Sequence, residues 1–181
     1  MMAFAILTIG CGEKKSDGVN SDELEDREGV AYLKNSNSPY TGKCFEFHDN
    51  GQKKSETTLK DGEYDGLSLG WYENGQKMVE GNYKDGKQDG LTVSWHENGQ
   101  KMMEANFKDD TPYGDATGWN ENGQKQFEKN YKDGNPDGLE TYWHENGQKN
   151  VERTWKDGTP ISSKYWNSKG EEVDSLEEAE Q

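Results

Sequence analysis

The sequence has no long apolar run, no excess of positive charge and only two cysteines among its 181 residues. The uncharged apolar stretch at residues 1–10 is too short for a transmembrane helix, because the hydrocarbon core of a bilayer is about 30 Å thick. The 21 Lys and Arg residues against 36 Asp and Glu give a formal net charge of -15. Nucleic-acid binding is therefore not expected, since phosphate contacts need a basic stripe. Cationic proteins, metal ions or neutral glycans are the better partners.

Apolar residues are also scarce. Hydrophobic residues make up 28% of the chain and charged residues 31%, with a mean hydropathy of -1.30. This composition is close to that of disordered chains, but 6 Trp, 9 Tyr, 5 Phe and 22 Gly residues argue against a featureless polymer. We expect an ordered structure with a thin core.

The sequence contains no constellation that indicates catalysis or a metal site. There is no Ser/His/Asp arrangement, no phosphate-binding loop and no Cys-x-x-Cys motif. His48, His96 and His144 recur at one repeat position, but their spacing places successive imidazoles roughly 19 Å apart on a polar face. Residues 133–138 match the first half of an EF-hand loop, yet His144 stands at its twelfth position instead of a Glu. We expect a turn there, no metal, no cofactor and no enzymatic activity.

The N-terminal residues resemble the end of a bacterial lipoprotein signal peptide. An apolar run reaches Gly10 and is followed by Cys11, the residue that such proteins lipidate. A basic segment, which a signal peptide has, does not precede it, so we expect the true start upstream of Met1. The predicted location is the bacterial envelope, lipid-anchored at the outer membrane or cell surface. The alternatives are that these residues form a short buried strand or are the N-terminus of a cytoplasmic protein.

Residues 12–29 are polar and acidic without periodicity, and they predict a flexible tether between this anchor and a folded body. If Cys11 carries lipid, Cys44 has no disulfide partner. A bridge between the two is the less favoured alternative, because it would constrain little.

One five-residue motif recurs at a fixed period of 24 residues. The sequence Glu-Asn-Gly-Gln-Lys appears four times, and Asp-Asn-Gly-Gln-Lys appears once before them. A period of this length is typical of an array in which each repeat is one small structural unit. The copies begin at Asp49, Glu73, Glu97, Glu121 and Glu145.

Each repeat has the pattern of one β-hairpin. Leu67, Leu69 and Trp71 alternate with other residues before the motif, as a strand requires. Asn74-Gly75 then predicts a type I′ turn, and Asp85-Gly86 supplies the return turn. The predicted fold is all-β, an elongated single antiparallel sheet of tandem hairpins over residues 30–173. A shortened last unit acts as a cap, and residues 174–181 form an acidic disordered tail.

Residues that lie 24 positions apart occupy equivalent places in successive repeats, and we call each such set a column. The columns predict the two faces of this sheet. The aromatic and aliphatic columns all have odd numbers, which predicts one shared face that is either a thin core or a platform for a glycan or peptide. The column from Glu56 to Glu152 has even numbers and is assigned to an opposite, solvated face. Candidate binding residues are Trp71, Trp95, Trp119, Trp143 and Tyr113, the last in a segment that departs from the repeat. The odd columns are Leu67, Leu91 and Leu139; Trp71, Trp95, Trp119 and Trp143; Val79, Met103, Phe127 and Val151; and Tyr83, Phe107, Tyr131 and Trp155.

The consensus GLxxxWYENGQKxxExxYKDGKxDG resembles the bacterial variant of the MORN repeat, over about residues 39–173. This variant occurs in YwqK-type antitoxins and in many lipoproteins. The resemblance implies hairpin repeats and, for some members, protein binding. We therefore expect a non-enzymatic envelope scaffold that binds another protein, with a cationic protein or a toxin as the candidate partner. The alternatives are an antitoxin or immunity protein that neutralises a toxin, and a glycan binder that uses the aromatic face.

Overall fold

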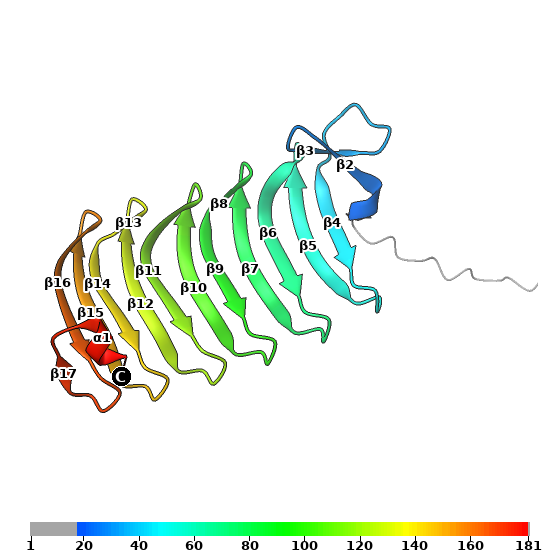
Figure 1. The fold of residues 1–181 in the computed structure, drawn as a ribbon. Coiled ribbons are helices and arrows are strands. Elements are labelled where there is room, and N and C mark those ends of the chain that lie inside the picture. The colour runs from blue at the N-terminus through cyan, green and yellow to red at the C-terminus, as the bar shows by residue number, and fades with distance from the viewer. Residues whose placement is uncertain (1–17, 181) are drawn as a thin grey trace, which may run out of the picture.

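The computed structural model describes residues 18–180, which form one long curved ribbon of antiparallel hairpins (Figure 1). Cys11 and the predicted lipid anchor lie outside the described residues. The long strands of the ribbon are β4 (Gly42–Phe47), β5 (Lys53–Lys60), β6 (Glu63–Trp71), β7 (Lys77–Lys84), β9 (Gly90–Trp95), β10 (Lys101–Lys108), β11 (Thr111–Trp119), β12 (Lys125–Lys132), β14 (Gly138–Trp143), β15 (Lys149–Lys156) and β16 (Thr159–Trp166).

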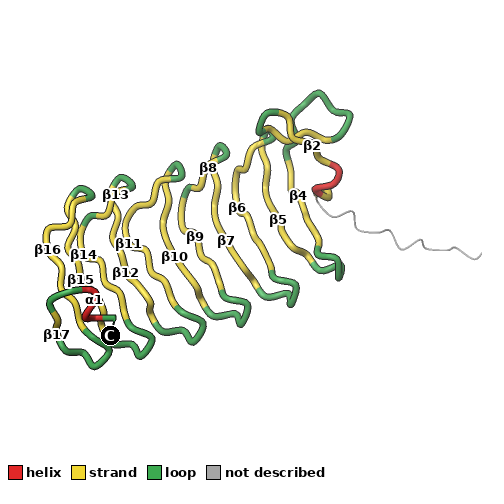
Figure 2. Tube along the Cα trace, viewed as in Figure 1, coloured by secondary structure: helices red, strands yellow, loops and turns green. Residues whose placement is uncertain are grey.

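The strands follow one another in chain order from β4 to β16, so the sheet is a meander in which each strand pairs with its sequence neighbours. Two short strands, β8 (Lys87–Gln88) and β13 (Asn135–Pro136), sit beside β7 and β12. The loops gather along the two long edges of the ribbon (Figure 2). The predicted all-β sheet of hairpin repeats is thus confirmed.

The two edges use two different turns. Along one edge, Asp85 and Gly86 have φ angles of 47° and 80°, which is the type I′ geometry. Along the other, Gly75 N donates to Tyr72 O at 2.9 Å and Tyr72 N donates to Gln76 O at 2.9 Å. Gly75 has a φ of 81°, but Asn74 is not left-handed. This is a three-residue loop, a type I turn closed by a left-handed glycine, so the predicted type I′ turn at Asn74-Gly75 was wrong.

The strand register corrects the predicted faces. Gly70 lies opposite Val79, and Leu67 lies opposite Asn82, so an even-numbered residue on one strand shares its face with an odd-numbered residue on the next. The odd columns therefore divide between the two faces, and the prediction of one aromatic face opposite a glutamate face was wrong.

We name the two faces by their aromatic residues. The tryptophan face carries the Trp and Leu columns of the strands that precede each motif, together with the glutamates of the strands that follow it. The tyrosine face carries the Val79 and Tyr83 columns with Ser68, Gly70 and their equivalents. The tryptophan face includes Leu67, Leu69, Trp71, Glu80, Leu91, Val93, Trp95, Glu104, Asp115, Thr117, Trp119, Glu128, Leu139, Thr141, Trp143 and Glu152.

The core is thin and lies mainly on the tyrosine face, where small residues are buried between half-buried aromatic rings. Gly118 shows why they are small, since a Cβ built on it would lie 2.2 Å from Cε1 of Phe127. No large side chain of the described residues is fully buried. The small buried residues are Gly70, Gly81, Thr92, Ser94, Ala105, Ala116 and Gly118.

The predicted flexible tether was wrong for residues 18–29, because the chain is folded from Gly18 onward. Strand β1 (Gly18–Asn20) pairs in parallel with β4. The 3₁₀ helix η1 (Ser21–Glu23) follows, with a capping box between Asn20 and Glu23. Strands β2 (Leu24–Arg27) and β3 (Val30–Leu33) form a separate hairpin. Strand β3 coincides with the apolar run at the start of the predicted repeat domain, whereas β2 was missed because Leu24 is its only apolar residue.

The C-terminal end also differs from the prediction. Strand β17 (Glu172–Val173) pairs with β16, and residues predicted as a disordered tail contain the helix α1 (Leu176–Ala179). Ser175 caps this helix by accepting a hydrogen bond from Glu178 N, and Ala179 is fully buried. The apolar pair Leu176 and Ala179 gives the acidic tail a side that packs on the end of the sheet. No described helix has the length and apolar character needed to cross a membrane.

Candidate interaction surface

In four of the five copies, a lysine on the tryptophan face links the glutamate to the next tryptophan along the sheet. Lys77 Nζ lies 2.6 Å from Glu80 Oε2 and 5.2 Å from the centre of the Trp95 ring. The same lysine position lies over the next tryptophan in four of the copies. The lysine ammonium groups therefore neutralise these glutamates and also cover the aromatic rings. The pairs are Lys53 with Trp71, Lys77 with Trp95, Lys101 with Trp119, and Lys149 with Trp166.

In four of the five copies, the side chain at the position of Tyr72 binds the backbone of the next copy. His48 Nε2 donates to Trp71 O at 2.9 Å, and Tyr72 Oη donates to Trp95 O at 2.7 Å. His96 and His144 do the same one repeat further on. The histidines were predicted to be solvated, but they are half-buried bridges. No group of residues in the described part of the chain could hold a metal ion.

The recurring motif also builds contacts between copies. Asn74 Oδ1 accepts from Gln76 N at 2.9 Å and closes the turn, while Asn74 Nδ2 donates to Glu97 O at 3.0 Å in the next copy. Gln76 lies over Gly99, where a Cβ would approach Gln76 Oε1 to 2.2 Å. The motif recurs because it closes one hairpin and ties it to the next.

The junction between the fourth and fifth copies lacks these ties. Asn120 replaces the histidine or tyrosine and accepts from Gln124 N within its own turn. Asn122 donates to Gln124 Oε1 instead of reaching Glu145. The edge opens there into a hollow lined by Asn120, Glu121, Asn122 and Glu145.

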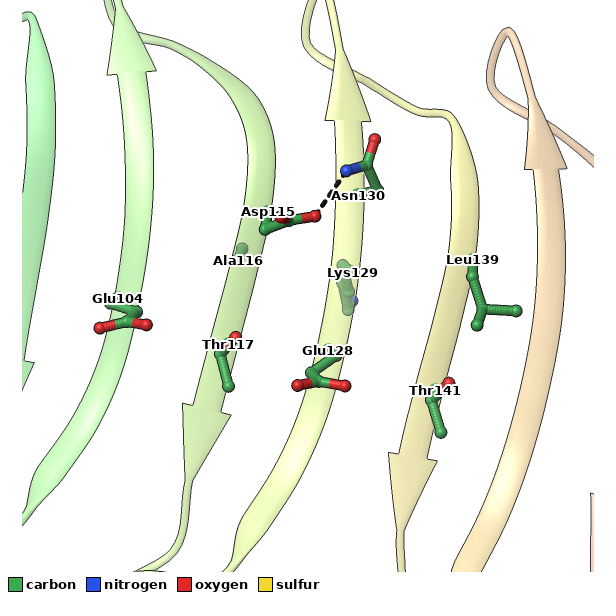
Figure 3. Close-up of a pocket in the computed structure, with 9 residues that line it drawn as sticks. All are labelled: Glu104, Asp115, Ala116, Thr117, Glu128, Lys129, Asn130, Leu139 and Thr141. Atoms are coloured by element: carbon green, nitrogen blue, oxygen red, sulfur yellow. Dashed lines mark hydrogen bonds between the residues drawn. The ribbon is translucent and has the colours of Figure 1, made fainter.

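A cavity of about 500 Å³ lies on the tryptophan face across β11, β12 and β14 (Figure 3). Part of its polar lining, Asp115, Thr117 and Thr141, departs from the repeat, whereas Glu104, Glu128 and Asn130 keep to it. Asp115 stands where the second and third copies have Leu67 and Leu91, and it accepts a hydrogen bond from Asn130 Nδ2 at 2.6 Å. The residues that line the cavity are Glu104, Asp115, Ala116, Thr117, Glu128, Lys129, Asn130, Leu139 and Thr141.

The predicted binding residues occupy distinct places. The four tryptophans are half-buried on the tryptophan face. Tyr113 lies opposite Asn106 on the same face and is 45% exposed. The segment around it departs from the repeat. It forms one unbroken strand, because β11 lacks the Asp-Gly break that separates β8 from β9.

A row of exposed leucines runs along this face. Leu67, Leu91 and Leu139 are 40%, 46% and 53% exposed. Leu67 and Leu91 lie opposite Asn82 and Asn106, and Leu139 lies opposite Thr154. The glutamates lie two residues further along the neighbouring strands, so the apolar area is rimmed by polar and negatively charged groups. The pattern of leucines was visible in the sequence, but their exposure was not, because the assumed face was wrong.

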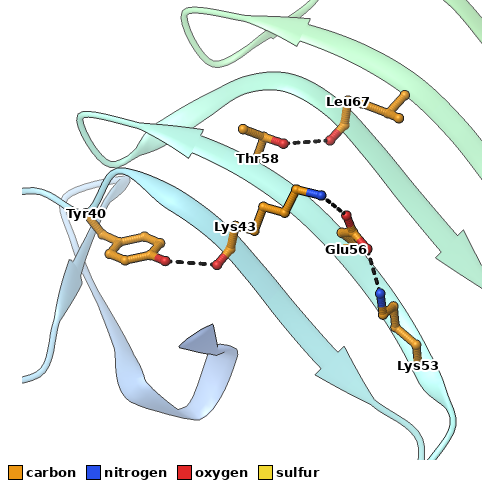
Figure 4. A network of polar contacts seen from close by, with 6 residues as sticks. All are labelled: Tyr40, Lys43, Lys53, Glu56, Thr58 and Leu67. Carbon is orange, nitrogen blue, oxygen red and sulfur yellow. Dashed lines mark hydrogen bonds and ion pairs between the residues drawn. The ribbon is translucent and has the colours of Figure 1, made fainter. Parts of the chain in front are cut away.

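Two lysines hold Glu56 at the N-terminal end of this face (Figure 4). Lys43 Nζ and Lys53 Nζ each lie 2.6 Å from one oxygen of Glu56. The hydrogen bonds from Lys43 and Lys53 lower the pKa of this carboxyl below its usual range. In the first copy, therefore, the face is neutralised more fully than elsewhere.

Glu140 forms a buried polar cluster on the tyrosine face that sequence reasoning missed. The residue is 5% exposed, and its Oε2 accepts from Trp155 Nε1 at 2.9 Å. Lys129 and Arg153 form ion pairs with it at 3.3 Å and 3.4 Å. Burial alone would raise the pKa of Glu140, but the hydrogen bond from Trp155 and the charge of Lys129 outweigh it, so the pKa is lowered.

Comparison with known proteins places the repeats in one family. A family model described as "MORN repeat variant" matches residues 40–61, 64–85, 88–109, 112–133 and 136–157. Each match begins within or shortly before the strand that precedes a motif copy and ends at the aspartate of the turn after it: Asp61, Asp85, Asp109, Asp133 or Asp157. No curated protein matches the chain.

Proposed function

Because the chain belongs to the family of MORN repeat variants, a non-enzymatic type of repeat, we propose that it is a scaffold that binds a basic protein partner across its tryptophan face. The observation that carries this proposal is the row formed by Leu67, Leu91 and Leu139, each at least 40% exposed. Exposed apolar area that is rimmed by polar groups marks an interaction site.

The negative net charge of the protein favours a cationic protein as the partner. A net charge of -15 attracts cationic proteins and speeds their association, most strongly at low ionic strength. The leucines supply area that becomes buried, and the glutamates and Asp115 supply the complementary charge. A toxin is one class of basic partner that fits this surface. A glycan ligand on the tryptophans stays a prediction, and no observation on this surface favours it.

The location belongs to the same proposal. We place the scaffold at the bacterial envelope, held by lipid on Cys11, since residues 1–11 have the pattern of a lipoprotein signal. A protein anchored in this way presents its sheet to partners beside the membrane.

The test is capture of a partner by the full chain and by a surface variant. Leu67→Ser, Leu91→Ser and Leu139→Ser are combined in one variant, and Tyr64→Ser with Met78→Ser is the control, since these two exposed residues line a hollow on the opposite face. A captured protein is then purified, and its Kd is measured for each variant. We expect the leucine variant to lose the partner and the control to keep it. Equal Kd values for all three proteins would overturn the proposal.

A further inference from the structure

The five motif copies share a residue pair that is prone to deamidation. Each contains Asn-Gly, in which the backbone nitrogen of the glycine can attack the side-chain amide of the asparagine, because glycine has no side chain in the way. Gly-Gln-Lys follows the asparagine in all five copies, and an acidic residue precedes it. The local sequence therefore gives the five asparagines the same intrinsic reactivity. They are Asn50, Asn74, Asn98, Asn122 and Asn146.

The five turns are also alike in backbone geometry and in exposure. The φ angle of the glycine lies between 81° and 84° in every copy, and its N–H donates to the carbonyl three residues before it at 2.8 or 2.9 Å. Oδ1 of each asparagine accepts from the backbone N–H of the glutamine at 2.9 or 3.0 Å. All five asparagines are exposed. Neither the backbone nor solvent access distinguishes one copy from another.

The copies differ in the partner of the side-chain amide nitrogen. In four of them Nδ2 donates to a backbone carbonyl of the next unit, at distances between 2.7 and 3.0 Å. In the fourth copy Asn122 Nδ2 donates to Gln124 Oε1 at 3.1 Å, and both side chains are exposed. A carbonyl held in the sheet fixes the amide, whereas an exposed glutamine side chain keeps its rotamer freedom. The Asn122 amide therefore rotates toward Gly123 N at a lower cost than its counterparts do.

One substitution accounts for the missing contact. From the tryptophan to the lysine, the third and fourth copies differ at a single position, where His96 is replaced by Asn120. His96 bridges to the backbone of the next copy, whereas Asn120 bonds within its own turn. The loop edge opens at this junction into the hollow that Asn122 lines. The hollow gives the amide room to turn.

We propose that Asn122 is a spontaneous modification site, which deamidates before the asparagines of the other four copies because its amide is not tied to the next copy. The inference is independent of the proposed function, since it needs no partner protein. The co-reactant is water.

The reaction begins when the backbone nitrogen of Gly123 gives its proton to water and bonds to Cγ of Asn122. The bond between Cγ and Nδ2 breaks, and Nδ2 leaves as ammonia with a proton from water. A second water molecule opens the cyclic imide at one of its two carbonyl carbons. Its oxygen enters a new carboxylate, one of its protons returns to the backbone nitrogen, and the other goes to ammonia. The products are aspartate and isoaspartate, in which the main chain runs through Cγ.

The product changes one junction of the array. It adds a negative charge beside Glu121 and Glu145, which line the same hollow, and like charges repel. Isoaspartate also lengthens the main chain of a three-residue turn by a methylene. Because stability in a linear array is close to a sum of repeat and interface terms, the loss is confined to the junction between the fourth and fifth copies.

The experiment is incubation of the full folded chain at mildly alkaline pH, followed by digestion with trypsin and mass spectrometry. Trypsin cuts after the lysine that ends each motif copy, so every peptide reports on one Asn-Gly pair. We expect Asn122 to deamidate about fivefold faster than the other four, which is the factor expected for one hydrogen bond of ordinary net strength. A rate at Asn122 equal to or below that of any other copy would overturn the proposal. The peptides are residues 44–53, 61–77, 88–101, 109–125 and 133–149.

Incubation in urea is the control, because it removes the structure and leaves the sequence. All five asparagines should then deamidate at the same rate. If Asn122 is still the fastest in urea, the local sequence sets its rate, and the assignment to the missing contact is wrong.

An exchange of one residue between two copies tests the cause. Asn120→His gives the fourth copy the residue of the third and should slow Asn122 to the rate of Asn98. His96→Asn does the reverse and should raise the rate at Asn98 to about that of the natural Asn122. A variant that unfolds is recognised by faster deamidation at all five sites. If both variants fold and neither rate changes, the contact with the next copy does not protect the amide, and the proposal is overturned.

Discussion

The ammonium group of Lys101 lies 5.4 Å from the centre of the Trp119 ring in the next copy and 2.6 Å from Glu104 in its own. One side chain therefore ties a carboxylate to an aromatic ring across the boundary between two repeats. In a linear array, stability is close to a sum of repeat and interface terms, so such a contact acts on one boundary only.

This relationship predicts a difference between two lysines of the same column. Lys101→Met removes a cation from the Trp119 ring and should lower the free energy of unfolding by about 0.5 to 1 kcal/mol. Lys125→Met removes only an exposed ion pair and should cost less than about 0.5 kcal/mol. Urea unfolding followed by tryptophan fluorescence compares the two, and equal losses would show that the ring contact contributes nothing.

The Glu140 cluster predicts a pH dependence of stability. Because the pKa of Glu140 is lower in the folded chain than in the unfolded one, its stabilisation is complete above the unfolded pKa of about 4.3 and is lost as the pH falls through the folded pKa. Glu140→Gln should lower the free energy of unfolding by about 2 kcal/mol at pH 7 and by less at acidic pH. Glu121→Gln, an exposed change of the same kind, is the control. A Glu140→Gln loss that stays constant from pH 7 to acid would contradict the assigned charge.

The tyrosine face predicts one stabilising substitution. Thr92 is 7% exposed, and its hydroxyl has no hydrogen-bond partner in the described chain. Thr92→Val keeps the shape and removes the unpaired hydroxyl, so it should raise the free energy of unfolding by about 1 kcal/mol. Thr57 lies on the same face but has Ser68 Oγ at 3.4 Å, and Thr57→Val should not be stabilising. The prediction fails if both substitutions shift the unfolding midpoint in the same direction.

The lipid anchor predicts a change of location. Expressed with its native upstream sequence in a bacterial host, the protein should fractionate with membranes, and Cys11→Ser should release it into the soluble fraction. Cys44→Ser is the matched control and should remain on the membrane. Release of both variants, or of neither, contradicts lipidation at Cys11.

The period of 24 residues was sufficient to predict the hairpins, their order and the single sheet. It was not sufficient to predict the faces, because Trp71 and Val79 are both odd-numbered yet lie on opposite sides. A three-residue loop and a bulge at Lys77 pair even-numbered residues of one strand with odd-numbered residues of the next. Alternation within one strand cannot reveal this pairing.

Two features of the candidate surface could have been found from the columns alone. Lys129 and Glu140 replace small residues on neighbouring strands with opposite charges, which is the signature of a paired substitution. Asp115, Thr117 and Thr141 likewise break apolar columns together. What the columns could not show is that Lys125 leaves Trp143 uncovered, since that depends on side-chain geometry. The ends of the domain were also missed, because short strands and a one-turn helix carry too few residues for a pattern.

The most direct test of the account is site-specific photocrosslinking in the cells that naturally produce the protein. A photoreactive phenylalanine analogue is placed at Leu91 on the tryptophan face or at Tyr64 on the tyrosine face, two positions that are 46% and 48% exposed. The account predicts one discrete protein adduct from position 91, rich in basic residues, and none from position 64. An adduct from position 64 alone would contradict it, because the partner would then bind the opposite face.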